Sequence, residues 1–306
     1  MASATLLLPS RARLPGPLPL AIGKALVHAE TAEGGAGERA QVRRHFRVIP
    51  DHWPVAALTR ALDAPDAGLS AWVRADPVHV APDMTGARLL AHGEAMAMAA
   101  EDAQQLLPAL KPLFGDFGFP IDAPHPARWY LCLPKDSRLP TFAEPGEALG
   151  DDLFAHLPAG EQGKRWRALL TEAQVVLHQH PWNVHRAGQG KPAVNSLWFW
   201  GAGAAPHAVE TAYDPVRSAD PLVQGLVKAA TKGDARQHEQ VQALLDLRHL
   251  RSLSSLTDEV LPPLLAELRS GELDVVHLDF QDGAAYALRR GGHWRFWRRP
   301  LASLVP

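Results

Sequence analysis

Residues 71–83 read Ala71-Trp-Val-Arg-Ala-Asp-Pro-Val-His-Val-Ala-Pro-Asp83, and their alternation predicts a strand over 71–80. Successive side chains of a strand point to opposite faces, so Arg74 and Asp76 share one face. Pro77 has no backbone N–H and is expected to end regular pairing. Asp76 is therefore predicted to lie near a strand end, where α/β proteins place binding groups.

The charged groups of this run have two interpretations. Asp76, His79 and Asp83 offer one imidazole and two carboxylates, which are ligand types that suit Mg, Mn or Zn. Alternatively, Arg74 and Asp76 form a structural ion pair while His79 packs or caps a turn. The spacing matches no standard metal motif, so both interpretations stay open at this point.

A second group of candidate residues belongs to an amphipathic helix predicted over 163–180. Its apolar stripe continues to His180, and Glu172 lies on the flank of the stripe. Pro181 disfavours the α conformation before it, so the helix is expected to end near His180. The partial negative charge of a helix C-terminus favours a protonated imidazole there. We therefore treat His180 as a candidate catalytic group, with Glu172 as a candidate general base.

The helix is followed by a predicted loop and then by a strand over 194–200. Polar anchors for a ligand could come from three residues of these segments, Asn183, Arg186 and Asn195, together with Arg74. Aromatic walls and a close backbone approach could come from Trp198, Trp200, Gly201 and Gly203. The alternative is that the tryptophans are core, the asparagines hold loop backbone and the glycines form a plain turn.

Strand and helix patterns interleave along the chain, which predicts an α/β fold with a mixed, mostly parallel sheet and flanking helices. Asp282-Gly283 between two strand-like runs predicts a C-terminal antiparallel hairpin. A helix is predicted over 236–246. The region around 30–40 is rich in glycine and is predicted to be a flexible loop. No linker separates two halves, so a single domain over 1–306 is expected.

Composition restricts the class of protein. The chain has 306 residues, 46% of them hydrophobic and 21% charged, which is typical of a globular protein. Its net charge of -2 gives no sign of the basic surface that nucleic-acid-binding proteins have. One cysteine, Cys132, allows no intramolecular disulfide and agrees with a reducing compartment. No apolar run is long enough to span a bilayer, so a cytoplasmic protein without membrane contact is expected.

Several blocks of the sequence together resemble a known family. They are Trp72-Val-Arg-Ala-Asp-Pro-Val-His79 with Pro82-Asp83, Arg128-Trp-Tyr-Leu131, Leu157-Pro-Ala-Gly160, Glu172-Ala-Gln174 and Asn195-Ser-Leu-Trp-Phe-Trp-Gly-Ala-Gly203. These blocks resemble the RpfE-type regulatory proteins of proteobacteria, which are often labelled phosphoglycerate mutases. The resemblance implies distant similarity to cofactor-independent phosphoglycerate mutases and a reduced alkaline-phosphatase-like fold. Those enzymes use two metal ions and a Ser or Thr nucleophile, a set that has no clear match in this sequence.

Three functions follow from these observations. The first is a regulatory or binding protein for a small anionic metabolite, phosphorylated or carboxylated. The second is a metal-dependent phosphomutase or phosphohydrolase that uses Mn, Mg or Zn. The third is a protein-interaction module that uses the basic tail over 289–299.

Overall fold

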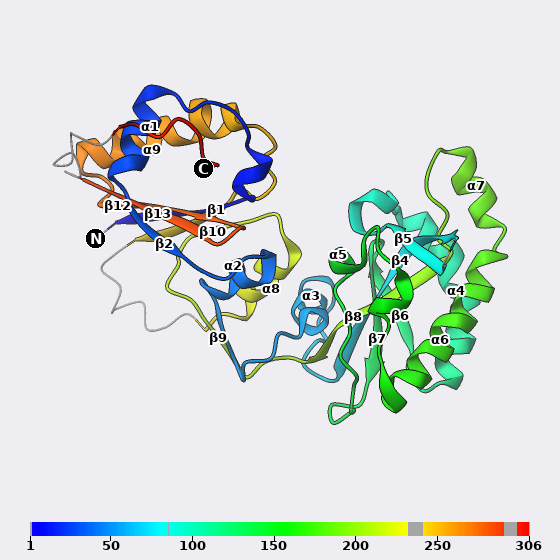
Figure 1. Cartoon of the computed structure of the whole chain (residues 1–306). Coiled ribbons are helices and arrows are strands. Elements are labelled where there is room, and N and C mark those ends of the chain that lie inside the picture. The colour runs from blue at the N-terminus through cyan, green and yellow to red at the C-terminus, as the bar shows by residue number, and fades with distance from the viewer. Residues whose placement is uncertain (1, 85, 232–240, 291–298, 306) are drawn as a thin grey trace. The chain divides into compact units, whose positions relative to one another are not determined.

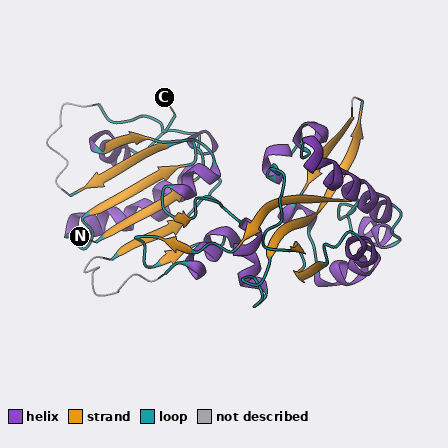
Figure 2. Ribbon diagram, turned by 90° about the horizontal axis from the view of Figure 1, so that it is seen from below, coloured by secondary structure: helices purple, strands orange, loops and turns teal. Residues whose placement is uncertain are grey.

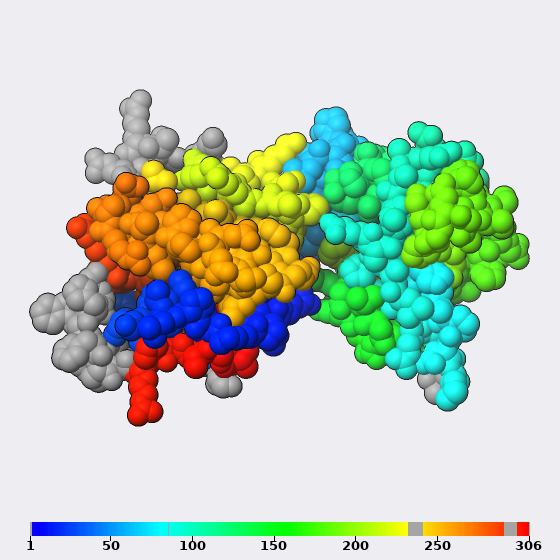
Figure 3. Space-filling view, turned by 90° about the horizontal axis from the view of Figure 1, so that it is seen from above, coloured from blue at the N-terminus to red at the C-terminus, as the bar shows by residue number. Residues whose placement is uncertain are grey.

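The computed structural model describes residues 2–84, 86–231, 241–290 and 299–305. The chain forms two compact units: unit 1 comprises Met1–Ile49 and Ala208–Pro306, and unit 2 comprises Pro50–His207. Unit 2 is thus an insertion within unit 1, and Figure 3 shows the blue N-terminal and red C-terminal residues together on one body. Each unit has its own sheet (Figure 2). The single α/β domain expected over 1–306 stays a prediction.

Unit 1 is built on a six-stranded sheet with the order β10-β11-β1-β12-β13-β2. Strands β10, β11, β1 and β12 are parallel, whereas β13 is antiparallel to both β12 and β2. A two-stranded ribbon of β3 and β9 lies where the chain leaves and re-enters this unit. The strands are β1 (Ser3–Leu8), β2 (Glu30–Glu33), β3 (Arg47–Ile49), β9 (Ala208–Glu210), β10 (Val216–Arg217), β11 (Gln242–Asp246), β12 (Val275–Phe280) and β13 (Ala284–Arg289).

Helices cover both faces of this sheet (Figure 1). On one face, α1 (Leu20–His28) and α9 (Leu261–Ser270) pack on alternate residues of the strands, such as Leu6, Leu278 and Phe280. On the other face lie α2 (Glu38–Arg43) and α8 (Pro221–Ala229). Shorter helical turns cover Arg11–Arg13 and Ser255–Val260. Because β12 alternates apolar and polar residues, its apolar side chains point to α1 and α9, and its polar side chains point the other way.

The predicted fold class is confirmed: the structure is α/β, with a mixed sheet and flanking helices. The C-terminal hairpin is β12–β13, and Gly283 adopts a φ of 92°, which suits glycine. Two local predictions were wrong. Residues 30–40 contain β2 and the start of α2, because β2 completes its hydrogen bonds on β13. Gln242–Asp246, predicted to be helical, is β11, held between β1 and β10.

Unit 2 contains a five-stranded sheet in which every pairing is antiparallel. Helices α4 and α6 cover one face and α3 lies against the other (Figure 1). Its strands are β4 (Ala71–Asp83), β5 (Gly86–Ala91), β6 (Ile121–His125), β7 (Arg128–Leu133) and β8 (Ser196–Ala204). Its helices are α3 (Val55–Asp63), α4 (Ala100–Asp116), α5 (Pro145–Ala148), α6 (Gly160–His178) and α7 (Trp182–Gly188), with shorter turns over Gly93–Met96 and Leu153–His156.

Strand β4 continues beyond Pro77, which was expected to end its pairing. One edge of β4 pairs with β8 through residues 71–78. Along its other edge, β4 pairs with β7 through 71–74 and with β5 through 79–83. On that second edge, Pro77 lies in the gap between the two ladders, where a residue without a backbone N–H is tolerated. This gap lets a proline occupy the middle of a long central strand.

Candidate functional site

The two segments singled out in the sequence lie side by side in unit 2. Strand β4 pairs with β8 so that Arg74 is opposite Trp200 and Asp76 is opposite Trp198. Arg74 and Asp76 share the sheet face that is covered by α3. The sequence therefore predicted the right neighbours, although their contacts give them a structural role.

Arg74 and Asp76 form a buried, two-pronged ion pair. Nε and Nη2 of Arg74 each donate to the Asp76 carboxylate at 2.8 Å, and the Trp200 indole donates to the same carboxylate at 2.7 Å. The side chains are 7% and 8% exposed. The Arg74 guanidinium also lies over the ring of Tyr130 and that of Trp200. The interpretation as a structural pair is the one that the contacts support.

The three candidate metal ligands do not converge. Asp76 is occupied by Arg74, Asp83 pairs with Arg88 at 2.6 Å, and Nδ1 of His79 lies 3.0 Å from the carbonyl oxygen of Ala193. Throughout the described residues, no group of three or more His, Cys, Asp or Glu side chains is placed to hold a metal ion. A Mn, Mg or Zn site at Asp76, His79 and Asp83 is therefore not supported by the structure.

Carboxylates do come together in unit 1, but they surround a guanidinium. Arg248 donates to Asp246 at 2.6 Å, to Asp220 at 3.0 Å and to Glu38 at 2.8 Å. Its side chain is only 10% exposed. The charge that a metal ion would supply to such a set is already supplied by the chain itself. These residues therefore do not fit the two-metal chemistry that the resemblance implied.

The two asparagines that were expected to hold a ligand hold backbone. The Asn195 amide accepts from the N–H of Val80 and donates to the carbonyl of the same residue, at 2.8 and 2.7 Å. Asn183 donates to the carbonyls of Leu177 and Val194 and accepts from the N–H of Val194. Asn195 thereby extends the pairing of β4 beyond the start of β8, and Asn183 fixes α7 to the end of α6. Asn183 was predicted to lie in a loop, but it belongs to α7.

Arg186 is fully buried, with 0% of its side chain exposed. Its guanidinium pairs with Asp102 at 2.6 Å and donates to the carbonyls of Pro192 and Met96 at 3.0 and 2.6 Å. A buried charge is tolerated when it is paired and hydrogen-bonded in this way. Arg186 therefore joins α7 to α4 and to the loop before β8.

The aromatic and glycine residues at β8 are also accounted for by packing. Trp198 is 3% exposed, lies in a core cluster and donates to the carbonyl of Ala143 at 2.9 Å. Gly201 and Gly203 adopt φ values of 63° and 145°. A Cβ on Gly201 would lie 2.8 Å from Val55 Cβ, so the glycine lets the start of α3 approach the sheet.

The two candidate catalytic residues at α6 do not form a site. Glu172 is exposed on the helix surface. Helix α6 ends at His178, close to the predicted end. Nδ1 of His180 accepts from the N–H of Trp182 at 3.2 Å, which caps the turn into α7. The structure places no other titratable group of the predicted set beside either residue.

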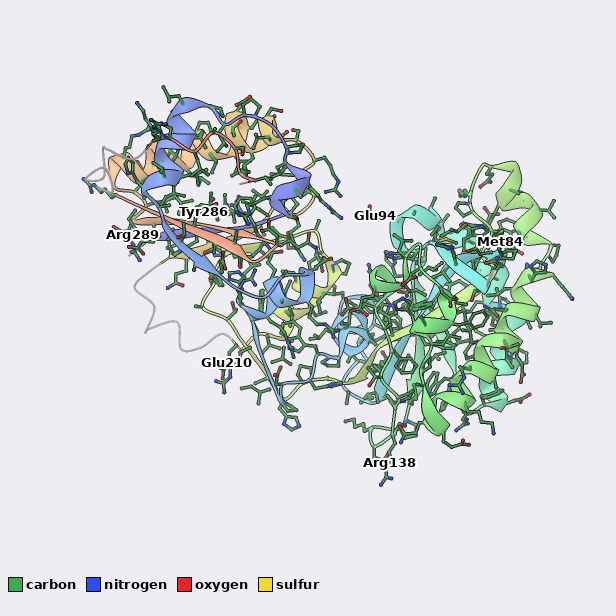
Figure 4. All side chains as sticks on the ribbon, viewed as in Figure 1. Met84, Glu94, Arg138, Glu210, Tyr286 and Arg289 are labelled. Carbon is green, nitrogen blue, oxygen red and sulfur yellow. The ribbon has the colours of Figure 1, made fainter. Side chains whose placement is uncertain are left out.

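A different site lies in unit 1, where the sheet face opposite α1 and α9 contains a hollow of about 400 Å³. We call it the sheet hollow. Its floor is formed by Thr5, His277, Asp279, Ala285 and Ala287, and its wall by Arg44, His45 and Tyr213. Glu30 and Arg289 lie at its rim, the latter at the end of β13 (Figure 4). Hollows of this size hold small metabolites.

Strand register explains why the face is hollow. Thr5, His277, Ala287 and Glu30 form one row across β1, β12, β13 and β2. In the next row with the same orientation, Asp279 is followed by two alanines, 285 and 32. Since alanine side chains end at Cβ, the floor lacks the bulk that would otherwise fill the space beneath α2.

Asp279 is the anchor of the wall. Arg44 binds its carboxylate through two nitrogens, at 3.0 and 2.6 Å, and His45 Nε2 donates to it at 2.6 Å. The side chain of Asp279 is 7% exposed and that of His45 8%. With Nε2 carrying the proton, Nδ1 of His45 accepts from the Tyr213 hydroxyl at 3.0 Å. A hydrogen-bonded chain therefore runs from Asp279 through His45 to Tyr213.

The protonation states of this chain follow from its contacts. Burial opposes ionisation of Asp279, but the hydrogen bonds from His45 and Arg44 outweigh it and lower the pKa of its carboxyl. Burial raises the pKa of the Tyr213 phenol, although a hydrogen bond with Thr5 acts in the opposite direction. Tyr213 is thus a donor and Asp279 an anion at neutral pH.

His277 occupies the centre of the floor row. Within the part of the chain that the structure describes, its imidazole makes no hydrogen bond and no ion pair. Arg289 pairs with Glu30 through Nε at 3.2 Å, and this is the one nitrogen of Arg289 that donates to a carboxylate among the described residues. The sequence carried a signal for this site: polar His277 and Asp279 alternate with apolar Val276, Leu278 and Phe280, as on a strand with one polar face.

Sequence similarity to curated proteins covers only part of the chain. No family model matches the chain. A segment of 66 residues is 39% identical to the probable 2,3-bisphosphoglycerate-independent phosphoglycerate mutase of Geobacter sulfurreducens. This segment is similar to phosphoglycerate mutases. The match covers 22% of this chain and 16% of that protein, and a 62-residue match to the Methanosarcina mazei mutase, also 39% identical, covers 20% and 16%.

Two solved structures resemble the whole chain more loosely. The cofactor-independent phosphoglycerate mutase of Thermoplasma acidophilum is 14% identical, with a TM-score of 0.39 over 94% of this chain and 89% of that one. The PH0037 protein of Pyrococcus horikoshii is 14% identical, with a TM-score of 0.48 over 98% and 90%. The distant similarity to cofactor-independent mutases thus rests on about a fifth of the chain. Among the described helices, none has the length and hydropathy needed to cross a bilayer.

Proposed function

We propose that this protein binds a small anionic metabolite, phosphorylated or carboxylated, in the sheet hollow of unit 1. The observation that carries the proposal is a hollow of about 400 Å³ that brings two arginines, two histidines and a tyrosine together on one sheet face. A regulatory role of the RpfE type, which the sequence resembles, would follow if the occupant is a metabolite whose concentration the protein senses.

The charges of the sheet hollow favour an anion over a cation. The negative charge of Asp279 is neutralised by Arg44, which contacts both of its carboxylate oxygens. Arg289, in contrast, is 48% exposed and donates to Glu30 through a single nitrogen, Nε. Arginine binds carboxylate and phosphate through two parallel N–H groups, and the terminal nitrogens of Arg289 offer such a pair.

The experiment is calorimetric titration of the protein with inorganic phosphate and with succinate. We expect saturable binding of at least one of them, and loss of binding in Ala287→Leu, because the longer side chain fills the floor. Ala187→Leu, on the exposed surface of α7 in unit 2, adds the same atoms away from the sheet hollow and should bind as the unchanged protein does. Absence of saturable binding of both anions, or equal binding by the two variants, would refute the proposal.

Metal-dependent phosphoryl transfer is the second candidate, favoured by the segment that is similar to phosphoglycerate mutases. The observation against this candidate is that Asp76, Asp220 and Asp246 are already paired with arginines, so these carboxylates are not available to a metal ion. Elemental analysis of protein purified without chelator tests it directly. Stoichiometric Mn, Mg or Zn would favour this candidate, and none after soaking in these ions would exclude a resident metal.

The interaction module proposed for the basic tail over 289–299 falls mainly on residues 291–298, which lie outside the described residues. Arg289 itself belongs to β13 and pairs with Glu30 at the rim of the sheet hollow. A pull-down with residues 291–299 deleted tests this third function, since loss of a partner that the full chain retains would support it.

A further inference from the structure

His277 is the one imidazole on the floor of the sheet hollow, at the middle of a row that ends at the rim. Thr5 flanks it on β1 and Ala287 flanks it on β13. The hydroxyl of Thr5 contacts Tyr213, and Ala287 has no polar side chain, so neither neighbour competes for the ring. Among the described residues, no hydrogen-bond partner of His277 is found. A partly buried imidazole with unused nitrogens beside a hollow is available to a ligand.

We infer that His277 couples anion binding to proton uptake: its imidazole takes a proton from solvent when an anion enters the sheet hollow, and the imidazolium then holds that anion. The inference rests on the proposed function and names the group that makes binding depend on pH. No covalent bond changes within the ligand or the protein backbone. The only exchange is one proton, from water or buffer to a ring nitrogen.

Every charged or titratable group around His277 bears on this step. Arg289 approaches from β13, His45 from the turn after α2 and Glu30 from β2, while Asp279 lies two residues along β12 on the same face. Asp279 is neutralised by Arg44, and Tyr213 stays protonated because its pKa is raised. The charged groups that remain, Arg289 and Glu30, form one ion pair at the rim, so no net negative charge faces the ring to favour its protonation.

These surroundings disfavour protonation of His277 when no ligand is present. Burial, followed by the charge of Arg289 and then by the neighbouring His45, lowers the pKa of His277, and Glu30 acts in the opposite direction. An anion between His277 and Arg289 reverses this balance, because it adds a negative charge next to the ring. The proton uptake is therefore largest at pH values between the pKa of His277 without the anion and the higher pKa of His277 with the anion bound.

The test uses sulfate as the probe, because sulfate stays a dianion throughout the range in which histidine titrates and contributes no protons of its own. The histidine ring signals are titrated by NMR with and without sulfate, and the His277 signal is assigned by its loss in His277→Gln. We expect sulfate to raise the pKa of His277 by about one unit, which equals about a tenfold tighter binding of sulfate to the protonated form. His178→Gln, on the exposed surface of α6, is the matched control and should leave that signal and its shift unchanged.

A second measurement needs no variant and covers the case in which His277→Gln fails to fold. Calorimetry of sulfate binding in two buffers with different ionisation enthalpies counts the protons taken up by the unchanged protein. Uptake that vanishes at about pH 8, together with weaker binding there, supports the inference. Sulfate binding without proton uptake overturns it and leaves the proposed function intact, whereas no sulfate binding at about pH 6 overturns it outright. The phosphate and succinate titrations judge the proposed function separately.

Discussion

Replacing Asp76 by asparagine probes the buried pair at the centre of unit 2. The change keeps the shape of the side chain and an oxygen that can accept from Trp200, but it removes the charge opposite Arg74. The Arg74 guanidinium then stays in a site that is 7% exposed, with Thr59 at 3.3 Å and one amide oxygen at position 76 as its hydrogen-bond partners. Breaking one partner of a buried ion pair costs about 3–5 kcal/mol.

The contacts that remain reduce that cost. The guanidinium keeps its positions over the rings of Tyr130 and Trp200, each worth about 0.5–2 kcal/mol. The amide oxygen introduced at position 76 also retains part of the hydrogen bonding. We therefore expect Asp76→Asn to lower the free energy of unfolding of unit 2 by about 2–4 kcal/mol. The double variant Arg74→Met with Asp76→Asn should recover part of this loss, because the uncompensated charge is gone.

The assay is urea unfolding followed by tryptophan fluorescence. It reports mainly on unit 2, since seven of the nine tryptophans lie there, at positions 53, 72, 129, 166, 182, 198 and 200. Asp83→Asn, in the same strand but in an exposed pair with Arg88, is the control and should leave the midpoint unchanged. If Asp76→Asn matches this control, or if the double variant is less stable than the single one, the reasoning about the buried pair is wrong.

Three further predictions follow from contacts in both units. Glu30→Gln frees the Arg289 guanidinium and should tighten phosphate binding several-fold by calorimetry; weaker binding would show that Glu30 helps to form the site. Burial acts to raise the pKa of Asp279, but the hydrogen bonds with His45 and Arg44 outweigh it and lower this pKa. The ionised carboxylate therefore stabilises the fold above about pH 4, and this stability is lost as the pH falls through the pKa of Asp279 in the folded protein. In acid titrations of the free energy of unfolding, Asp279→Asn should therefore show a shallower fall than the unchanged protein, and parallel curves would count against this. Asn195→Ala leaves the N–H and carbonyl of Val80 without side-chain partners and should cost about 1–3 kcal/mol in urea unfolding, whereas a change near zero would mean that water replaces the amide.

Much of the local structure could be predicted from patterns of short period. The alternation in 71–80, the stripe on the helix that ends near His180 and the Asp282-Gly283 turn each reflect contacts within one element or one hairpin. Such patterns can be read from the sequence because an element that packs on a core needs the same spacing of apolar residues, whichever element it packs against. The neighbouring positions of β4 and β8 were also predicted correctly, from the concentration of aromatic and charged residues in both.

The site was harder to predict because polar residues look alike whether they bind ligand or backbone. Asn195 and Arg186 are engaged by carbonyls and N–H groups that no sequence pattern reveals. The sheet hollow, in contrast, depends on strand order, since His277 and Thr5 meet only because β12 pairs with β1. Strand Gln242–Asp246 was mistaken for helix because its short apolar run carries no period of its own.

The position of β1 has a consequence for how the protein is made. Strand β1 is translated before both of its partners, β11 and β12, which follow more than 230 residues later. At about 5–20 residues per second, β1 waits for about 10–50 s before it can be paired. Residues 50–207 are complete well within that interval. Unit 2 can thus acquire its fold during translation, while Leu6, Leu7 and Leu8, which are buried in the folded protein, wait for β11 and β12 to be made.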